Sequence, residues 1–301
     1  MSGCFQNWCF QALRRCLRCW HLRAYSPPER ALACGESTAV VNERSLQSRG
    51  DEHAFRAGMP GKNVEWVPCS TAVLDKMFEL ANVAPGDYLI DPGSGDGRIV
   101  IGAAKLGARA FGLEANSDLV ELSRRIAEAE GVSDRVSFSV GDFFDCDFSD
   151  ATVVTLFLRW DINLALRGKI LALKPGTRVV SNIFDMGDWI ADQIVKVEDE
   201  NYYFRNHTVY LWIVPATVEG IWKLSDGVLT LRQRYQILEG NLVCPGKTLP
   251  ASGRVSGKQV SIIIDGREFQ AEVSGNRMDM TSGGSRGIRW SALLDGMSPP
   301  E

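Results

Sequence analysis

The sequence of 301 residues lacks any apolar run of the roughly 18 residues that a membrane-spanning helix needs. It has only three histidines, His21, His53 and His207, and none stands at a strand end where catalysis or metal binding would use it. Cys16 and Cys19 form one C-x-x-C pair, but no second pair has matching spacing. We therefore expect a soluble protein without a metal site.

Basic residues are scarce in the middle of the chain. Residues 60–217 hold 15 Lys and Arg against 23 Asp and Glu, a net charge of −8. A surface that binds a long nucleic acid gains most of its affinity from Lys and Arg that pair with phosphates. The acidic middle segment therefore disfavours such a partner, although it leaves a short or folded RNA open.

Acidic residues are missing before Glu29, and four arginines stand in that stretch. This composition is similar to that of a transit peptide, but no continuous apolar segment of the secretory type is present. We expect residues 1–58 to form an extension outside the fold. We expect the protein to be cytoplasmic, with targeting by the extension as the alternative.

From Ser70 onward, short apolar runs alternate with segments of helical periodicity. The predicted strands are 88–90, 109–114, 135–140, 151–158, 177–184, 192–199 and 207–214. The predicted helices begin at Ser70, after the turn at 91–98, at Ser117 and near 161, with Ser70 and Ser117 as caps. Strands separated by helices predict a mostly parallel sheet with helices on both faces. The last two strands, which no helix separates, are expected to form an antiparallel hairpin at the edge.

After Pro215 the sequence changes to short β-like runs separated by turn residues, such as 228–238, 259–265 and 268–275. This texture predicts a small antiparallel β domain over residues 217–301. The chain would then consist of an extension (1–58), an α/β domain (59–216) and this β domain.

The stretch DPGSGDGR at residues 91–98 follows a predicted buried strand and opens a helix. Glycine weakens helices and strands, so three of them at alternate positions indicate a backbone that approaches a ligand closely. A P-loop is excluded, because Arg98 and Ile99 stand where Lys and Ser or Thr are required. A dinucleotide fingerprint is disfavoured, because Arg98 stands where helix packing needs a small residue. The carboxylate of Asp91 suits a cationic ligand better than a pyrophosphate, which favours a zwitterionic amino acid.

This D-x-G-x-G-x-G pattern resembles motif I of the class I S-adenosylmethionine-dependent methyltransferases. The resemblance covers about residues 66–215 and includes Glu114 after the second strand, Gly141-Asp142 after the third, and LKPG before the fifth. It implies a seven-stranded, mostly parallel Rossmann-like sheet. It also implies S-adenosyl-L-methionine as the cofactor, released as S-adenosyl-L-homocysteine.

The resemblance assigns the cofactor contacts to the ends of the first three strands. Asp91 and the glycine turn would hold the methionine part, Glu114 the ribose hydroxyls, and Asp142 the adenine amino group, because ionised carboxylates only accept hydrogen bonds. The implied cofactor-binding residues are Asp91, Gly93, Ser94, Gly95, Asp96, Gly97, Glu114, Asp142 and Phe143. Two alternatives remain: Asp142 as a helix cap and Glu114 as a solvated strand end.

The longer stretch DPGSGDGRIVIGAAK is similar to motif I of protein lysine methyltransferases that act on the adenine nucleotide translocase and the c subunit of ATP synthase. It is closer to uncharacterised bacterial proteins that share VVTL, LKPGTRVVS and FDMGDW. Position 92 is usually leucine in that group, whereas Pro92 here removes one backbone donor.

The acceptor is expected at the carboxyl ends of the fourth and fifth strands, where open α/β sheets bind ligands. A lysine amine has a reference pKa near 10.4, so the site must lower that value or accept the proton. We predict Asp161 nearest the acceptor and Trp160 shaping the pocket, with Asp185 or Asp188 as second choices. The alternative is that Asp161 only caps the next helix.

The resemblance implies a methyltransferase that acts on a protein amine, with a lysine amine as the first choice. A small-molecule methyltransferase, with the β domain roofing the pocket, and a noncatalytic cofactor-binding module are the alternatives. The D/N-P-P-Y/F signature of adenine and glutamine amide methyltransferases is missing, which disfavours those acceptors. The expected partner is therefore a protein or small-molecule methyl acceptor.

Overall fold

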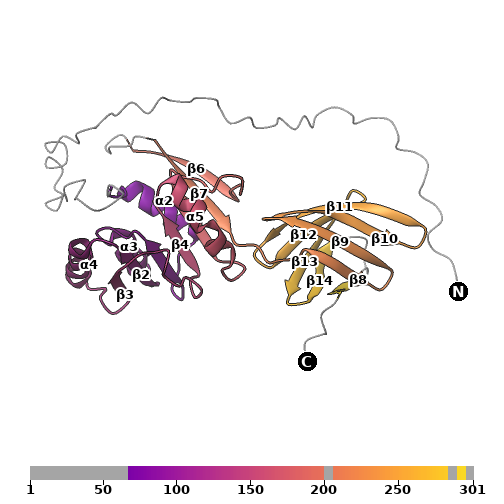
Figure 1. Ribbon diagram of the computed structural model, residues 1–301, viewed down its shortest axis with the longest axis horizontal. Coiled ribbons are helices and arrows are strands. Elements are labelled where there is room, and N and C mark those ends of the chain that lie inside the picture. Colours follow the sequence, from indigo (N-terminus) through magenta and orange to yellow (C-terminus); the bar gives the residue numbers. More distant parts are fainter. Residues whose placement is uncertain (1–66, 200–205, 284–289, 296–301) are drawn as a thin grey trace. The chain divides into compact units, whose positions relative to one another are not determined.

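The computed structural model describes residues 67–199, 206–283 and 290–295 (Figure 1). The predicted extension at 1–58, with its C-x-x-C pair, lies outside these residues. Within the described ranges, no helix is long and apolar enough to cross a membrane.

A seven-stranded sheet forms the first half of the described chain, in the order β3-β2-β1-β4-β5-β7-β6. Its strands are β1 (Tyr88–Pro92), β2 (Arg109–Glu114), β3 (Val136–Val140), β4 (Val153–Leu156), β5 (Arg178–Asn182), β6 (Gln193–Glu198) and β7 (Asn206–Ile213). Strands β1 to β5 pair in parallel, whereas β7 is antiparallel to both β5 and β6. This arrangement confirms the predicted sheet and its antiparallel edge hairpin.

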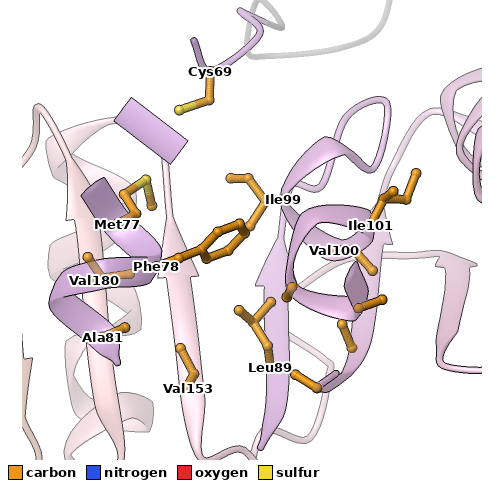
Figure 2. Packing of buried hydrophobic residues seen from close by; sticks show 14 of the residues in the cluster. Cys69, Met77, Phe78, Ala81, Leu89, Ile99, Val100, Ile101, Val153 and Val180 are labelled. Atoms are coloured by element: carbon orange, nitrogen blue, oxygen red, sulfur yellow. The ribbon is translucent and has the colours of Figure 1, made fainter. Parts of the chain in front are cut away.

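Helices cover both faces of the sheet. Neighbouring residues of a strand point to opposite faces, and the apolar side chains on each face are buried by the helices that cover it. The helices are α2 (Thr71–Ala81), α3 (Arg98–Lys105), α4 (Ser117–Ala129) and α5 (Trp160–Leu171). Leu89 lies in a cluster with side chains of α2, α3 and α4, part of which Figure 2 shows, whereas Ile90 lies in a cluster with α5. Each such fully buried side chain contributes about 1.5–3 kcal/mol to folding. The strands therefore need apolar residues at consecutive positions.

Of the two predicted N-terminal helix caps, one is confirmed and one is wrong. Ser70 caps α2, because its Oγ accepts a hydrogen bond from Val73 N at 3.4 Å. The prediction of Ser117 as the cap of α4 is wrong by one residue. Asn116 is the cap, and its Oδ1 accepts from Asp118 N at 3.1 Å.

The second half of the described chain is a closed antiparallel barrel in the order β10-β11-β12-β13-β14-β15-β8-β9. Its strands are β8 (Gly220–Leu224), β9 (Gly227–Arg234), β10 (Ile237–Cys244), β11 (Lys247–Ser256), β12 (Gln259–Ile264), β13 (Arg267–Ser274), β14 (Arg277–Gly283) and β15 (Ser291–Leu294). An apolar cluster that includes Trp222 and Leu229 is buried in it. Each of these eight strands is paired with a neighbour on both sides, as closure of the barrel requires.

The barrel confirms the predicted antiparallel β architecture but corrects one detail. The run 228–238 appeared to be a single β segment, yet it turns at Tyr235 and Gln236 and forms two paired strands. Tyr235 has φ +54°, which the turn requires although no glycine marks it. The domain limits at 58 and 216 remain a prediction.

Candidate active site

The glycine turn after β1 adopts a backbone that other residues would strain. Gly93, Gly95 and Gly97 all have positive φ, and the amides of Gly93 and Ser94 donate to Leu113 O at 2.7 and 3.1 Å. A Cβ at Gly93 would also lie 2.8 Å from Leu158 Cδ2. The turn therefore packs tightly between β2 and the end of β4.

Asp91 is a buried carboxylate at the end of β1, 2% exposed. Thr155 Oγ1 donates to its Oδ1 at 2.7 Å, and Oδ2 makes no hydrogen bond within the described part of the chain. Burial raises the pKa of Asp91 to about 7; the Thr155 hydrogen bond opposes this, and the Glu114 and Asp96 carboxylates add to it. A cationic ligand would offset the free-energy cost of ionising this buried carboxyl group.

Ser94, in the glycine turn, carries a second buried side-chain oxygen. Its side chain is 5% exposed, and its Oγ has no hydrogen-bond partner among the residues that the structure describes. Buried polar atoms are almost always paired, so two such oxygens within one turn indicate a polar ligand.

Glu114 ties the end of β2 to the turn. Its Oε2 accepts from Gly95 N at 3.1 Å and its Oε1 accepts from Asn116 N at 2.9 Å. Each carboxylate oxygen keeps further acceptor capacity, which ligand hydroxyl groups can use. The side chain is half-buried, so the alternative of a freely solvated strand end does not describe it.

Asp142 follows β3 and is exposed. Its Oδ1 accepts from Phe144 N at 2.8 Å, and no helix occurs between β3 and β4, so the helix-cap alternative is wrong. Gly141 N donates to Glu114 O at 3.1 Å, which brings Asp142 beside the end of β2. Phe143 is half-buried, with its ring centroid 4.9 Å from that of Phe144.

Asp96 differs from Asp91, Glu114 and Asp142 because an arginine side chain forms a salt bridge with it. Arg98 donates to it from Nε at 3.0 Å and from Nη2 at 2.6 Å. Arg98 Nη1 also donates to Cys69 O at 2.9 Å. The carboxylate thereby fixes the turn to the segment that precedes α2.

The predicted acceptor residues lie at the start of α5. Trp160 is 58% exposed, and Asp161 stands in the first turn of the helix. Arg159 donates to the Asp161 carboxylate from Nε at 3.1 Å and Nη2 at 3.0 Å. The helix cap is Arg159, so the alternative in which Asp161 caps the helix is wrong.

Asp185 and Asp188 lie between β5 and β6 in different surroundings. Asp185 is exposed and accepts from Gly187 N at 3.0 Å. Asp188 accepts from Arg234 Nη2, Tyr235 Oη and Arg167 Nη1, and these bonds, that from Arg234 first, lower its pKa to about 2. Such a weak base is a poor proton acceptor.

A buried polar group near the end of β5 was not predicted from the sequence. Asn182 Oδ1 lies 3.0 Å from His207 Nδ1, and Asn163 Nδ2 donates to Ser181 Oγ at 3.3 Å and to Phe184 O at 3.1 Å. Asn163 and Asn182 are fully buried and His207 is 1% exposed. The only sequence signal was polar residues inside apolar elements.

A family model described as the ANTKMT methyltransferase domain matches residues 91–193. A protein-lysine N-methyltransferase of Saccharolobus islandicus is 43% identical over 155 residues, which are 50% of this chain and 94% of that protein. The chain belongs to the ANTKMT methyltransferase family. It is an S-adenosylmethionine-dependent methyltransferase. The buried oxygens of Asp91 and Ser94, which have no hydrogen-bond partner among the described residues, fit a polar, cationic cofactor.

Further relatives of this ANTKMT-family chain match it over a shorter share of their length. A human lysine N-methyltransferase named for the c subunit of ATP synthase is 35% identical over 43% of this chain and 55% of its own. The mouse adenine nucleotide translocase lysine N-methyltransferase is 36% identical over 42% and 56%. The chain thus spans little more than half of these two relatives. A solved RNA methyltransferase of Salinibacter ruber, in complex with S-adenosyl-L-homocysteine, shares 47% identity, with 50% of this chain and 96% of that chain covered and a TM-score of 0.47.

Proposed function

We propose that this methyltransferase transfers the methyl group of S-adenosyl-L-methionine to the side-chain amine of a protein lysine. The observation that carries the proposal is the 43% identity to a protein-lysine N-methyltransferase over 94% of that relative's length. The human and mouse relatives named for lysine acceptors support the same acceptor chemistry.

The proposed cofactor contacts follow the acceptor groups of the first three strand ends. The cofactor supplies an electrophilic methyl group on a sulfonium. Asp91 Oδ2 and Ser94 Oγ would bind its methionine part, because both atoms are buried without a partner in the described residues. Glu114 would accept from the ribose hydroxyls and Asp142 from the adenine amino group, with Phe143 beside the ring. Asp96 would act through Arg98, since the two side chains already form a salt bridge.

For the acceptor we propose Asp161 as the carboxylate nearest the lysine amine, with Trp160 beside it and Asp185 as the second choice. A carboxylate there would attract the ammonium group and accept its proton before transfer. Asp161 is paired with Arg159 at 3.0 Å, and both side chains are about half exposed, so the pair is weak enough to open. A lysine ammonium would share or replace the Arg159 contact.

Incubation of the purified protein with methyl-labelled cofactor and a cell lysate tests the acceptor class. Half of each labelled sample is digested with protease and half with nuclease, and the labelled protein is then hydrolysed to amino acids. We expect the label to be lost to protease alone and to elute as methylated lysine. A parallel reaction with Asp91→Asn protein serves as the control for transfer by contaminating enzymes.

Other outcomes would replace the proposal. Label sensitive only to nuclease would identify an RNA acceptor, and label confined to low-mass material would identify a small molecule. Cofactor binding without any transfer would favour a noncatalytic module. Methylated arginine in the hydrolysate, or labelled methylamine released from a methylated glutamine amide, would keep the protein acceptor but refute the lysine.

We also propose a cytoplasmic location and domain limits at residues 58 and 216. The acid-poor residues 1–58 are the part of the chain that would redirect it. Microscopy of the full chain and of a chain without residues 1–58 tests the location. Limited proteolysis followed by mass spectrometry tests the limits, and cleavage inside 220–283 but not near 216 would contradict them.

A further inference from the structure

The segment between β5 and β6, residues 183–192, begins with a strained backbone. Ile183 has φ +69°, and a β-branched residue in this region is a rare outlier. Such strain persists only where surrounding contacts hold the backbone in place. The segment carries Asp185 and follows the strand end where we place the acceptor.

One set of these contacts comes from α5. Asn163 Nδ2 donates to Phe184 O at 3.1 Å, and Arg167 Nη1 donates to Met186 O at 2.8 Å. Arg167 Nη1 also lies 2.5 Å from Asp188 Oδ1. The helix that begins with Trp160 and Asp161 therefore holds the first half of the segment.

The second set comes from the turn between β9 and β10 of the barrel. Arg234 Nη2 donates to Asp188 Oδ2 at 2.7 Å, and Tyr235 Oη donates to Asp188 Oδ1 at 3.0 Å. The Tyr235 ring stacks on Trp189 with centroids 5.9 Å apart, and Gln236 Nε2 donates to Ile190 O at 2.5 Å. Three successive barrel residues thus contact three successive residues of the segment.

Asp188 and Tyr235 join the two sets of contacts. Asp188 pairs with Arg167 of α5 and with Arg234 of the barrel. The Arg167 guanidinium also lies over the Tyr235 ring, 5.5 Å from its centroid. A shift of the barrel turn would therefore be transmitted to both α5 and the strained segment.

We propose that the β9–β10 turn of the barrel, through Arg234, Tyr235 and Gln236, positions the segment 183–192 for methyl transfer. These are positioning residues, because they act through Asp188, Trp189 and Ile190 and not on the methyl group. The inference rests on the proposed acceptor site at the ends of β4 and β5. It gives the barrel a role in turnover beyond folding.

The test uses the full chain with the double substitution Arg234→Gln and Tyr235→Phe. It removes the positive charge of Arg234 and the hydroxyl of Tyr235, the two barrel groups that bind Asp188, but keeps the ring on Trp189. The matched control is Arg277→Gln, which removes another exposed barrel arginine paired with an aspartate, Asp279, within the barrel. Melting curves first confirm that both variants fold.

The main measurement is apparent kcat and KM with labelled cofactor and the lysate protein fraction at several concentrations. We expect kcat of the double variant to fall about 3- to 10-fold, because small misplacements of reacting groups slow transfer. The affinity for S-adenosyl-L-homocysteine should stay within about 2-fold, since the glycine turn is untouched. Arg277→Gln should leave all three quantities unchanged. An unchanged kcat in the double variant would overturn the proposal.

Hydrogen exchange of residues 183–192 provides a readout that needs no acceptor. We expect faster exchange there in the double variant and not in Arg277→Gln, and equal exchange in all three proteins would overturn the positioning role. If the wild type labels no protein lysine but exchange still responds, the proposed acceptor fails and the positioning contact stands. If lysine is labelled while neither kcat nor exchange responds, only the positioning role fails.

Discussion

Replacement of Asp91 by Asn should stabilise the cofactor-free protein at pH 8 while it weakens cofactor binding. Burial raises the pKa of Asp91 from 3.8 to about 7. Between these values the unfolded chain releases a proton that the folded protein keeps, so stability falls as the pH rises from about 4 to 7. The full loss of folding stability is reached above pH 7. A shift of about three pKa units corresponds to a loss of about 4 kcal/mol.

Asparagine keeps the shape of Asp91 and cannot ionise, but its buried N–H would lack an acceptor, which costs about 1–3 kcal/mol. The net gain in the free energy of unfolding at pH 8 should therefore be about 2 kcal/mol. The wild type regains about 2–3 kcal/mol between pH 8 and pH 5, because Asp91 becomes protonated. Urea denaturation at pH 5, 6.5 and 8 measures the free energy of unfolding of both proteins, and the difference between them should shrink as the pH falls.

Cofactor affinity should change in the opposite direction. Removal of one partner from a buried charge pair costs about 2–5 kcal/mol, so Asp91→Asn should weaken S-adenosyl-L-homocysteine binding about 30- to 5,000-fold. Isothermal titration calorimetry at pH 8 measures the two dissociation constants. The combination of higher stability and lower affinity would distinguish a ligand-facing carboxylate from a structural one.

Asp87, just before the start of the same strand, provides the matched control. Thr152 Oγ1 donates to its Oδ1 at 2.8 Å, as Thr155 does to Asp91, but Arg178 also pairs with it. Burial alone would raise the pKa of Asp87, yet the hydrogen bonds from Ala84 N, Thr152 and Arg178 outweigh it and lower the pKa. Asp87→Asn should therefore reduce stability at neutral pH, lose that effect as the pH falls below about 4, and leave cofactor affinity unchanged. If Asp91→Asn instead behaved like Asp87→Asn, the reasoning about Asp91 would be refuted.

Three further substitutions or modifications test other parts of the site. Gly97→Ala places a Cβ 2.8 Å from the Phe138 ring at φ +78°, so thermal melting should show a loss of about 2 kcal/mol and calorimetry a weaker cofactor affinity. Asp161→Asn should lower kcat at least about 10-fold with unchanged cofactor affinity, and an unchanged kcat would exclude its proposed role. Cys69 is 3% exposed, and burial raises its pKa to about 12, so native protein at pH 8 should resist iodoacetamide there while the half-buried Cys244 reacts, as peptide mass spectrometry would show.

The sheet and the glycine turn were predictable because their signals are local. The apolar run 88–90, the glycines at alternate positions and the helix after them specify a strand, a turn and a helix within about 20 residues. The parallel pairing then follows from the helices between strands. Because β2 lies beside β1, Glu114 at the end of β2 comes within hydrogen-bond distance of the glycine turn.

The barrel could be predicted only in outline. Its closure depends on the pairing of β15 with β8, about 70 residues apart, and no local pattern specifies that register. The turn at Tyr235 lacks the glycine or asparagine that marks such turns, so the run 228–238 appeared continuous. The contact between Asn182 and His207 joins residues 25 positions apart on two strands and has no local signature either.

The two carboxylates after β5 show why the acceptor side resists prediction from sequence. Asp185 and Asp188 occupy equivalent places in FDMGDW, and a strand-end position favours a functional role for both. Their partners separate them: Asp185 accepts one local backbone bond, whereas Asp188 binds Arg167, 21 residues away, and Arg234, 46 residues away. A carboxylate with two arginine partners stays ionised and holds structure, so of these two we propose only Asp185 as a group that could bind a lysine ammonium. One of the two arginines that distinguish them lies in α5 and the other in the barrel, so the difference depends on contacts between elements that are far apart in the sequence.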